Sequence, residues 1–290
     1  MSPESSVEQK QLLQDQRAIM KMLSSTAVMC LFILLILAVH TAPAAPEQNN
    51  RVKRQITTEK KIFMTNYPNS TDDEFDGCKD QMYNRVTTQL LKKELTSNAK
   101  FRLAWKAAKS SLYLGNTWDF TLTREDLRRI ALRAYTENTI YRELNNKMHE
   151  GRRTYMNKFG LISLHFLITD GIQTRNAQHE CRTTYRRTSA AIIIKKDFVR
   201  FGSFASSSLK ATLGNFGSET CFIINTCFGA DISDISAYPD EAEVLIPPYE
   251  KFKSKPVTVK PPELSDCNRV YRLRSTGTKS NMKCRLVNKV

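Results

Sequence analysis

Residues 238–250 read YPDEAEVLIPPYE. This stretch places two carboxylates, Glu241 and Glu243, at the start of a short, mostly apolar strand predicted at 243–246. Because side chains alternate along a strand with a period of two, Glu241 and Glu243 are expected on the same side. Two carboxylates on one face repel each other, so at least one is expected to have a raised pKa. Such pairs support reactions at an anomeric carbon, where one group stabilises an oxocarbenium-like centre and the other handles a proton.

Two further segments carry polar groups that fit the same chemistry. Residues 181–188 read CRTTYRRT and predict a strand with arginines at its end, which suit bidentate recognition of a phosphate. Residues 200–209 read RFGSFASSSL, a strand running into three serines that could hold sugar or amide groups. An anionic sugar nucleotide is a substrate that uses all of these groups.

The wider pattern divides the chain into a helical half and a strand half. Apolar residues at helical spacing predict helices at 81–95, at 99–112 and from Thr123, and the apolar segment 161–172 is expected to be buried. Thr123 and Asp126 resemble a capping box. Short β-branched or aromatic runs predict strands at 183–185, 190–194, 198–204, 221–224 and 243–246. Helices followed by strands predict an α+β fold, with an N-terminal helical lobe packed on a mostly antiparallel core.

Composition excludes several classes of protein. The 290 residues are 41% hydrophobic and 25% charged, which excludes global disorder. The sequence has no Gly-rich dinucleotide or P-loop motif, no serine-hydrolase elbow and no zinc-protease motif. The net charge is +15, and residues 55–290 keep 38 basic side chains against 25 acidic ones. The basic character therefore belongs to the folded part and predicts attraction to anions, polyanions included.

The N-terminal part has the features of a secretory leader. The apolar run 27–39 is short for a membrane span but typical of a signal peptide, and Ala42-Pro43-Ala44 resembles its cleavage site. We expect a signal peptide with an upstream extension at 1–44, then a polar basic segment at 45–59. An uncleaved signal anchor is the alternative. The C-terminus lacks an apolar tail, which favours secretion without a lipid anchor.

The remaining features of the sequence agree with a protein of the secretory pathway. An RVKR sequence at 51–54 is a candidate processing site, with a solvated basic cluster as the alternative, and Asn69 begins a glycosylation sequon. Beyond the leader six cysteines remain, and their spacing alone does not fix their pairing. We expect no metal site, since no C-x-x-C pair exists and the histidines do not cluster with cysteines.

The ordered set of arginine, serine and E-x-E resembles the arginine-specific mono-ADP-ribosyltransferases, in particular the vertebrate ecto-enzymes. FASSS and EAEVLIPPYEKF are similar to that family, as are ALRAYTENTIYRELN, LHFLITDGI, FGSETCFIINTCFGADIS and LRSTGTKSNMKC. The resemblance implies a catalytic domain at 60–290, mainly helical over 60–175 and mainly strands over 176–290. It implies a two-sheet core that binds NAD, or NADP, and transfers ADP-ribose to a protein arginine with release of nicotinamide.

By the same resemblance, residues can be matched to roles in binding NAD. Arg186 matches the arginine that contacts the phosphates and ribose. Ser206 matches the first serine of the family pattern, although Ser207 or Ser208 could take its place. Phe216 matches the aromatic residue that stacks on nicotinamide.

The two glutamates match the family's catalytic pair. Glu243 matches the glutamate that binds the nicotinamide-ribose 2′-hydroxyl and stabilises the oxocarbenium ion. Glu241 matches the glutamate that orients and deprotonates the incoming guanidinium. Glu250 is expected to be structural or exposed.

The resemblance also implies disulfides, and it shows one departure from the family. Cys181–Cys227 and Cys78–Cys284 match family bridges, and Cys221 and Cys267 are left as a candidate third pair. Arg187 stands where many relatives have glycine. It is expected either to add a phosphate contact or to alter how NAD lies.

Alternative functions stay open at this point. An NAD glycohydrolase would use water in place of arginine, and a non-enzymatic basic secreted protein would bind polyanions on the same fold. The expected partners are NAD and extracellular or secretory-pathway proteins with exposed arginines. No obligate nucleic acid is expected, and the protein is expected to be a monomer.

Overall fold

The computed structural model describes residues 61–112 and 122–287, all within one compact unit, Thr58–Val290. The predicted leader, the RVKR site and the remainder of the polar segment up to residue 60 lie outside the described residues. Within the described ranges, no helix combines the length and the apolar character needed to cross a membrane.

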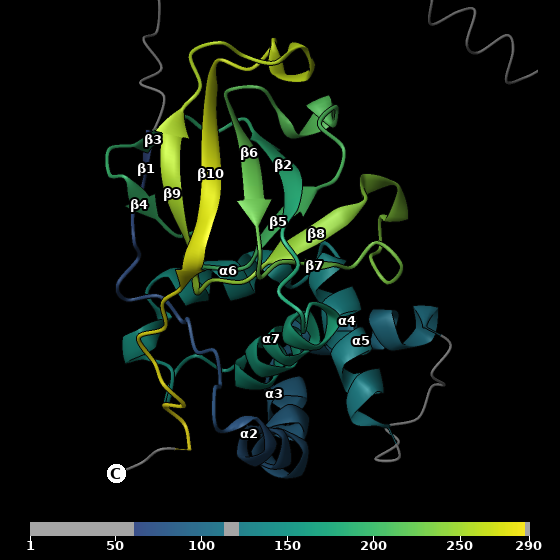
Figure 1. Ribbon diagram of the computed structural model, residues 1–290. Coiled ribbons are helices and arrows are strands. Elements are labelled where there is room, and N and C mark those ends of the chain that lie inside the picture. The colour runs from purple at the N-terminus through teal and green to yellow at the C-terminus, as the bar shows by residue number, and fades with distance from the viewer. Residues whose placement is uncertain (1–60, 113–121, 288–290) are drawn as a thin grey trace, which may run out of the picture. The chain divides into compact units, whose positions relative to one another are not determined.

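Helices make up one half of this unit, at the lower end in Figure 1. They are α2 (Lys79–Arg85), α3 (Leu91–Ser97), α4 (Ala99–Ser111), α5 (Arg124–Thr136), α6 (Tyr141–His149) and α7 (Ile162–Arg175). A π-helical segment, Val86–Leu90, joins α2 to α3. At the start of α5, Thr123 and Asp126 form both hydrogen bonds of the predicted capping box. Helix α7 is buried along most of its length, as its apolar sequence predicts.

Strands make up the other half. They are β1 (Ile62–Met64), β2 (Arg182–Thr188), β3 (Ile192–Ile194), β4 (Phe198–Val199), β5 (Ala205–Ser208), β6 (Thr220–Thr226), β7 (Ala230–Asp231), β8 (Glu243–Ile246), β9 (Glu250–Pro256) and β10 (Arg269–Thr278). Among the described residues, eight form a sheet in the order β4-β9-β10-β6-β2-β5-β8-β7, and β1 pairs with β3. Only the β6–β10 and β1–β3 pairings are parallel within this part of the chain. The α+β fold with a mostly antiparallel core is therefore confirmed.

The eight-stranded sheet is weakly paired at its centre, between β2 and β5. Within the described part of the chain, β2 and β5 pair only through Tyr185 and Ser208, whereas β2 and β6 pair along seven positions. Strands β5 and β8 cross the view at an angle to β2 and β6 (Figure 1). The two parts of the sheet therefore diverge on either side of this single pair.

Two strand expectations differ from the structure. The predicted strand 198–204 ends at Val199, because the buried Arg200 turns to pair with Asp72 and Gly202 has a φ of +73°. The sequence analysis did not predict β9 and β10. Lysines and arginines alternate with buried residues in these strands, so they contain no continuous β-branched run.

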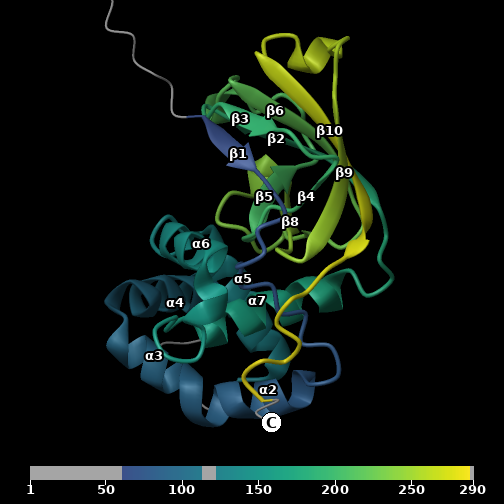
Figure 2. The ribbon, with the colours of Figure 1, turned by 90° about the vertical axis from the view of Figure 1, so that its left-hand side faces the viewer.

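Disulfides join segments that are distant in the sequence. The described cysteines pair as Cys78–Cys284 and Cys181–Cys227, which the resemblance implies, and as Cys221–Cys267, the candidate third pair. After β10 the chain runs down to the helical half (Figures 1 and 2), where Cys284 is bonded to Cys78, the residue before α2. Closing a loop as long as the one between Cys78 and Cys284 contributes about 5 kcal/mol in the chain-entropy model.

The sequon at Asn69 lies in a tight turn. The Asn69 side chain is partly exposed, whereas Ser70 and Thr71 are fully buried. The Asn69 carbonyl accepts a hydrogen bond from the Arg152 amide at 3.0 Å. Glycosylation at this position stays a prediction.

Candidate active site

Three neighbouring strands bring the predicted site residues together. Arg186 lies on β2, the three serines form most of β5, and Glu243 begins β8. In the antiparallel β5–β8 pair, Ser208 lies opposite Glu243. Segments about 20 and 57 residues apart in sequence therefore meet at the divergence of the sheet.

A cleft of about 460 Å³ opens at this place. Its lining includes every residue predicted for the site: Arg186, Ser206, Ser207, Ser208, Phe216, Glu241 and Glu243. Helices α5 and α6 contribute the opposite wall. Phe216 ends a short 3₁₀ turn at the cleft, and 44% of it is exposed, which leaves an open ring face for a planar ligand.

The two glutamates reach the cleft by a route that the sequence analysis did not predict. Glu241 ends a 3₁₀ turn, Pro239–Glu241, and does not lie in the strand. Ala242 then has a left-handed backbone with a φ of 46°, and Glu243 begins β8. The expected strand alternation is therefore wrong for Glu241, because Pro239 starts a turn that Ala242 ends. Both side chains still line the same cleft.

Glu243 is a buried carboxylate. One side of it contacts the protein, and the other side faces the cleft. It is 5% exposed, and its Oε2 accepts a hydrogen bond from Ser236 Oγ at 2.9 Å. Burial raises the pKa of Glu243, while the Ser206 and Ser236 hydroxyls and the charge of Arg186 oppose that rise. These partners favour the ionised form inside a largely dry site.

Glu241 lies nearer to solvent. Partial burial raises its pKa, and the neighbouring charge of Glu243 adds to the rise. Its backbone carbonyl accepts a hydrogen bond from Ser208 Oγ at 2.5 Å, which fixes the turn to β5. A carboxylate with a raised pKa at a cleft is a better proton acceptor than an ordinary surface glutamate.

The three serines of β5 have different partners. Ser207 Oγ donates to the Val244 carbonyl at 2.9 Å, and Ser208 Oγ donates to the Glu241 carbonyl. Ser206 is the serine whose hydroxyl interacts with Glu243. The hydroxyls of Ser207 and Ser208 are bonded to backbone carbonyls, which leaves Ser206 as the candidate for a direct part in the site.

Arg186 lies within this group. Its Nη1 donates to the Ser206 backbone carbonyl. Desolvation lowers the pKa of Arg186, while the nearby groups of Tyr135 and Glu243 raise it. A desolvated guanidinium attracts an anion more strongly than a hydrated one, because less screening water separates the charges.

Sequence reasoning missed the residues that helices α5 and α6 contribute. Tyr135 lies behind the serines; burial raises its pKa to about 12, and its hydroxyl accepts a hydrogen bond from Asn145 Nδ2 at 3.0 Å. Asn138 Nδ2 donates to the Tyr238 hydroxyl at 2.5 Å across the cleft. The available signal was a run of polar and aromatic residues, 135–145, at the end of an amphipathic helix.

Arg187 also lines the cleft, but its guanidinium is bonded on several sides and is not a free cation there. Its guanidinium forms two 2.7 Å bonds to the Asp266 carboxylate and donates to the backbone carbonyls of Ala211 and Glu263. It therefore ties the segment leading to Phe216 to the loop that Cys267 anchors. This arrangement favours an indirect effect on ligand placement over a second phosphate contact.

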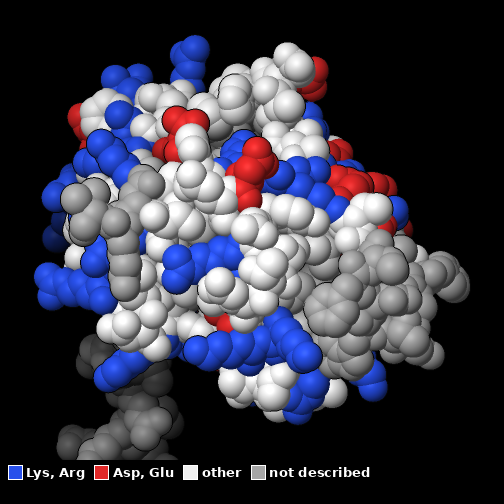
Figure 3. Space-filling model, turned by 90° about the horizontal axis from the view of Figure 1, so that it is seen from below, with Lys and Arg blue, Asp and Glu red and all other residues white. Residues whose placement is uncertain are grey.

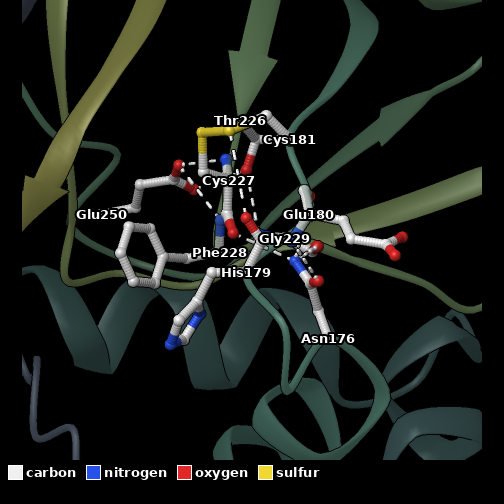
Figure 4. Close-up of a disulfide and its surroundings, with 9 residues drawn as sticks. All are labelled: Asn176, His179, Glu180, Cys181, Thr226, Cys227, Phe228, Gly229 and Glu250. Atoms are coloured by element: carbon white, nitrogen blue, oxygen red, sulfur yellow. Dashed lines mark hydrogen bonds between the residues drawn. A yellow bond between two sulfur atoms is a disulfide. The ribbon is translucent and has the colours of Figure 1, made fainter.

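A polar junction at the base of β2 fixes the strand that carries Arg186. The Cys181–Cys227 disulfide joins the start of β2 to the end of β6, and the Asn176 amide donates to the carbonyls of Cys227 and Gly229 (Figure 4). The fully buried Glu250 accepts from Thr226 Oγ1 at 2.5 Å and from the Cys227 amide at 2.8 Å. Glu250 is structural, and it is buried.

Within residues 61–112 and 122–287, no group of three or more His, Cys, Asp or Glu side chains could hold a metal ion.

Comparison with known proteins identifies the family. The sequence profile described as NAD:arginine ADP-ribosyltransferase matches residues 64–280. The chain is 32% identical over 239 residues to the erythroblast NAD(P)(+)--arginine ADP-ribosyltransferase of Gallus gallus, covering 79% of this chain and 77% of that protein. It is 34% identical to ecto-ADP-ribosyltransferase 5 of Bos taurus, of which the match spans 65% of the length.

Solved structures agree with the fold. The chain matches the eukaryotic mono-ADP-ribosyltransferase ART2.2, a mutant in complex with NADH, with a TM-score of 0.66 and 29% identity, covering 77% of this chain and 98% of that one. Another ART2.2 mutant, in complex with NAD, matches with a TM-score of 0.65. The protein belongs to the NAD:arginine ADP-ribosyltransferase family.

Proposed function

We propose that the protein is an active NAD:arginine mono-ADP-ribosyltransferase, which moves ADP-ribose from NAD to arginine side chains and releases nicotinamide. One observation carries the proposal. A buried carboxylate, Glu243, shares a cleft with an arginine and with a second, partly exposed carboxylate, Glu241. Burying one carboxylate beside another costs desolvation and repulsion, and perturbed groups of this kind cluster at functional sites.

The groups of the cleft fit NAD. Arg186 supplies a guanidinium for the diphosphate, and Phe216 supplies an exposed ring for nicotinamide. Hydroxyls and amides on the facing helices supply donors and acceptors for the riboses. NADP is the alternative donor.

Glu243 then acts on the bond that breaks. Its open carboxylate oxygen accepts a hydrogen bond from the nicotinamide-ribose 2′-hydroxyl, and its charge stabilises the oxocarbenium ion that forms as nicotinamide leaves with the bonding electrons. Ser206 and Ser236 hold the carboxylate in place for this step. Since the group must be ionised to act, a raised pKa moves the acid limb of activity upward.

Glu241 acts on the acceptor. A guanidinium stays protonated in water, so it needs a neighbouring base before its nitrogen can attack the anomeric carbon. Glu241 is open to solvent and has a raised pKa, which suits it to orient the acceptor and take its proton. Extracellular or secretory-pathway proteins with exposed arginines are the proposed acceptors, and a secreted monomer is the proposed form.

The test uses the disulfide-bonded protein with NAD and agmatine, a free guanidinium acceptor. Nicotinamide and ADP-ribosyl-agmatine are quantified together. Glu243→Gln is expected to lower both by about a hundredfold or more. Glu241→Gln is expected to abolish the adduct while leaving much of the nicotinamide release. Glu263→Gln, an exposed site outside the cleft, is the matched control and keeps both activities.

Other results would replace the proposal. Nicotinamide release without adduct in the unmodified protein would make it an NAD glycohydrolase. A folded protein that gives neither product would be a binding protein on this fold.

A further inference from the structure

The outer face of β9 and β10 carries an unusual array of positive charge. Lys253 and Lys255 on β9, and Arg272 and Arg274 on β10, are all exposed. The register sets Arg272 directly opposite Lys255 and Arg274 directly opposite Lys253. These four side chains are called the β9–β10 band below.

The band is electrostatically costly. Like charges directly opposite each other on neighbouring strands destabilise a sheet. None of the four side chains has a hydrogen bond or ion pair with any residue that the structure describes. An anion bound across the strands would relieve this repulsion.

The sheet leaves this face open to a ligand. The opposite face of β9 and β10 is covered by β1 and β3, where Met64 and Ile192 pack near Phe252 and Leu273. Opposite side chains lie about 5 Å apart across a strand pair. Charges two residues apart along a strand lie about 7 Å apart. The result is a flat two-by-two lattice of cations, which fits an extended chain of anions better than one small ion.

Positive charge alone does not distinguish the band. Figure 3 shows Lys and Arg side chains spread over the helical end of the molecule as well. There, however, Arg124 pairs with Asp80 and Asp170, and Arg128 pairs with Glu125 and Asp170. The band differs because its charges face each other without such partners.

We propose that the β9–β10 band binds a sulfated glycosaminoglycan chain. Sulfates carry charge without a flat base. The band itself contains no aromatic side chain, and the ring beside it, Phe198, is 41% exposed but has the Lys251 ammonium 5.2 Å from its centroid, which takes up one of its faces. Nucleic-acid surfaces combine charge with exposed aromatic side chains. Three disulfides in the described part indicate an oxidising compartment, where sulfated glycans are the abundant linear polyanions.

The test measures the affinity of the disulfide-bonded protein for a size-defined heparin oligosaccharide at several salt concentrations. The band variant changes Lys253, Lys255, Arg272 and Arg274 to Gln. The matched control removes the same charge from four exposed lysines on or near the helices, Lys93, Lys100, Lys106 and Lys158. The band variant is expected to bind at least about tenfold more weakly and with a shallower salt dependence, since fewer counterions are released.

The control variant is expected to stay within about twofold of the unmodified protein. Equal weakening in both variants would overturn the proposal, because it would reduce the effect to net charge. Equal affinity for desulfated heparin, for single-stranded DNA of matched length or for phosphatidylserine vesicles would overturn the assignment to sulfated glycan. Agmatine modification, which uses the cleft and not the band, and a cooperative melting curve report whether the variants are folded. Removing the like charges of the band is expected to leave the melting temperature unchanged or to raise it.

Discussion

Glu243 and Glu250 are two buried glutamates of one sheet, and their surroundings differ in one respect. Both are at most 5% exposed, and burial raises the pKa of both. Glu250 accepts hydrogen bonds from a threonine hydroxyl and from the backbone amides of Cys227 and Phe228. Glu243 has serine hydroxyls on one side and the cleft on the other.

The difference separates a structural carboxylate from one that can act. The donors around Glu250 all come from the chain itself, so they hold the end of β6 against the start of β9. Glu243 keeps capacity for a donor that the chain does not supply. Burial and a raised pKa are therefore shared by both residues, and the open side of the carboxylate is what marks the candidate catalytic group.

The largest expected difference between Glu243→Gln and Glu250→Gln is in enzymatic activity. Glu243→Gln is expected to lower the rate of nicotinamide release by about a hundredfold or more, because the amide cannot stabilise positive charge on the ribose. Glu250→Gln is expected to keep most of the activity per folded molecule. Active-site titration against the folded fraction checks both. A comparable loss in the two variants would mean that Glu250 also positions the cleft.

Stability gives the reverse contrast. In Glu250→Gln the side-chain NH₂ group would face backbone N–H groups that now donate to the carboxylate. Two donors would then face each other, and a buried backbone N–H would lose its acceptor. The expected loss is about 2 kcal/mol in the free energy of unfolding. Glu243→Gln is expected to change it little, since the cleft accommodates the amide. Urea denaturation under non-reducing conditions measures both, and equal losses would remove the distinction.

The sequence was sufficient for the fold class and for the residues of the candidate site, but not for how they meet. A family pattern marks Arg186, Ser206 and Glu243 because their chemistry is tied to their order in the chain. It could not reveal that Ala242 adopts a left-handed conformation, which turns Glu241 out of the strand. Nor could it reveal the α5 wall, because Tyr135 looks like an ordinary apolar helix position.

Two adjacent arginines show why side-chain partners stay hidden in a sequence. Arg186 and Arg187 alternate on β2, so they point to opposite faces of the sheet. Arg186 enters the cleft, while Arg187 meets Asp266, a residue 79 positions further along the chain. A contact over that distance depends on the packing of two loops, which no local pattern encodes.

The smallest expected effect is on how stability varies with pH. The folded-state pKa of Glu243 is raised, so protonated Glu243 stabilises the folded protein. This contribution to the free energy of unfolding is complete below the unfolded-state pKa, about 4.3. It is lost as pH rises through the folded-state pKa. An uncharged Gln pays no such ionisation penalty. The stability of Glu243→Gln relative to the unmodified protein should therefore improve from pH 4 to pH 7, by about 1 kcal/mol or less.

Glu250→Gln provides the control for this last measurement. Burial also raises the pKa of Glu250, so the deficit of Glu250→Gln is expected to narrow over the same pH range. Its lost hydrogen bonds are expected to keep it less stable than the unmodified protein at pH 7. Melting curves of the three proteins across this pH range give both trends. If Glu243→Gln were as much less stable than the unmodified protein at pH 7 as Glu250→Gln is, the Glu243 carboxylate would be as fully bonded by the chain as Glu250, and its open side would not be available to a substrate.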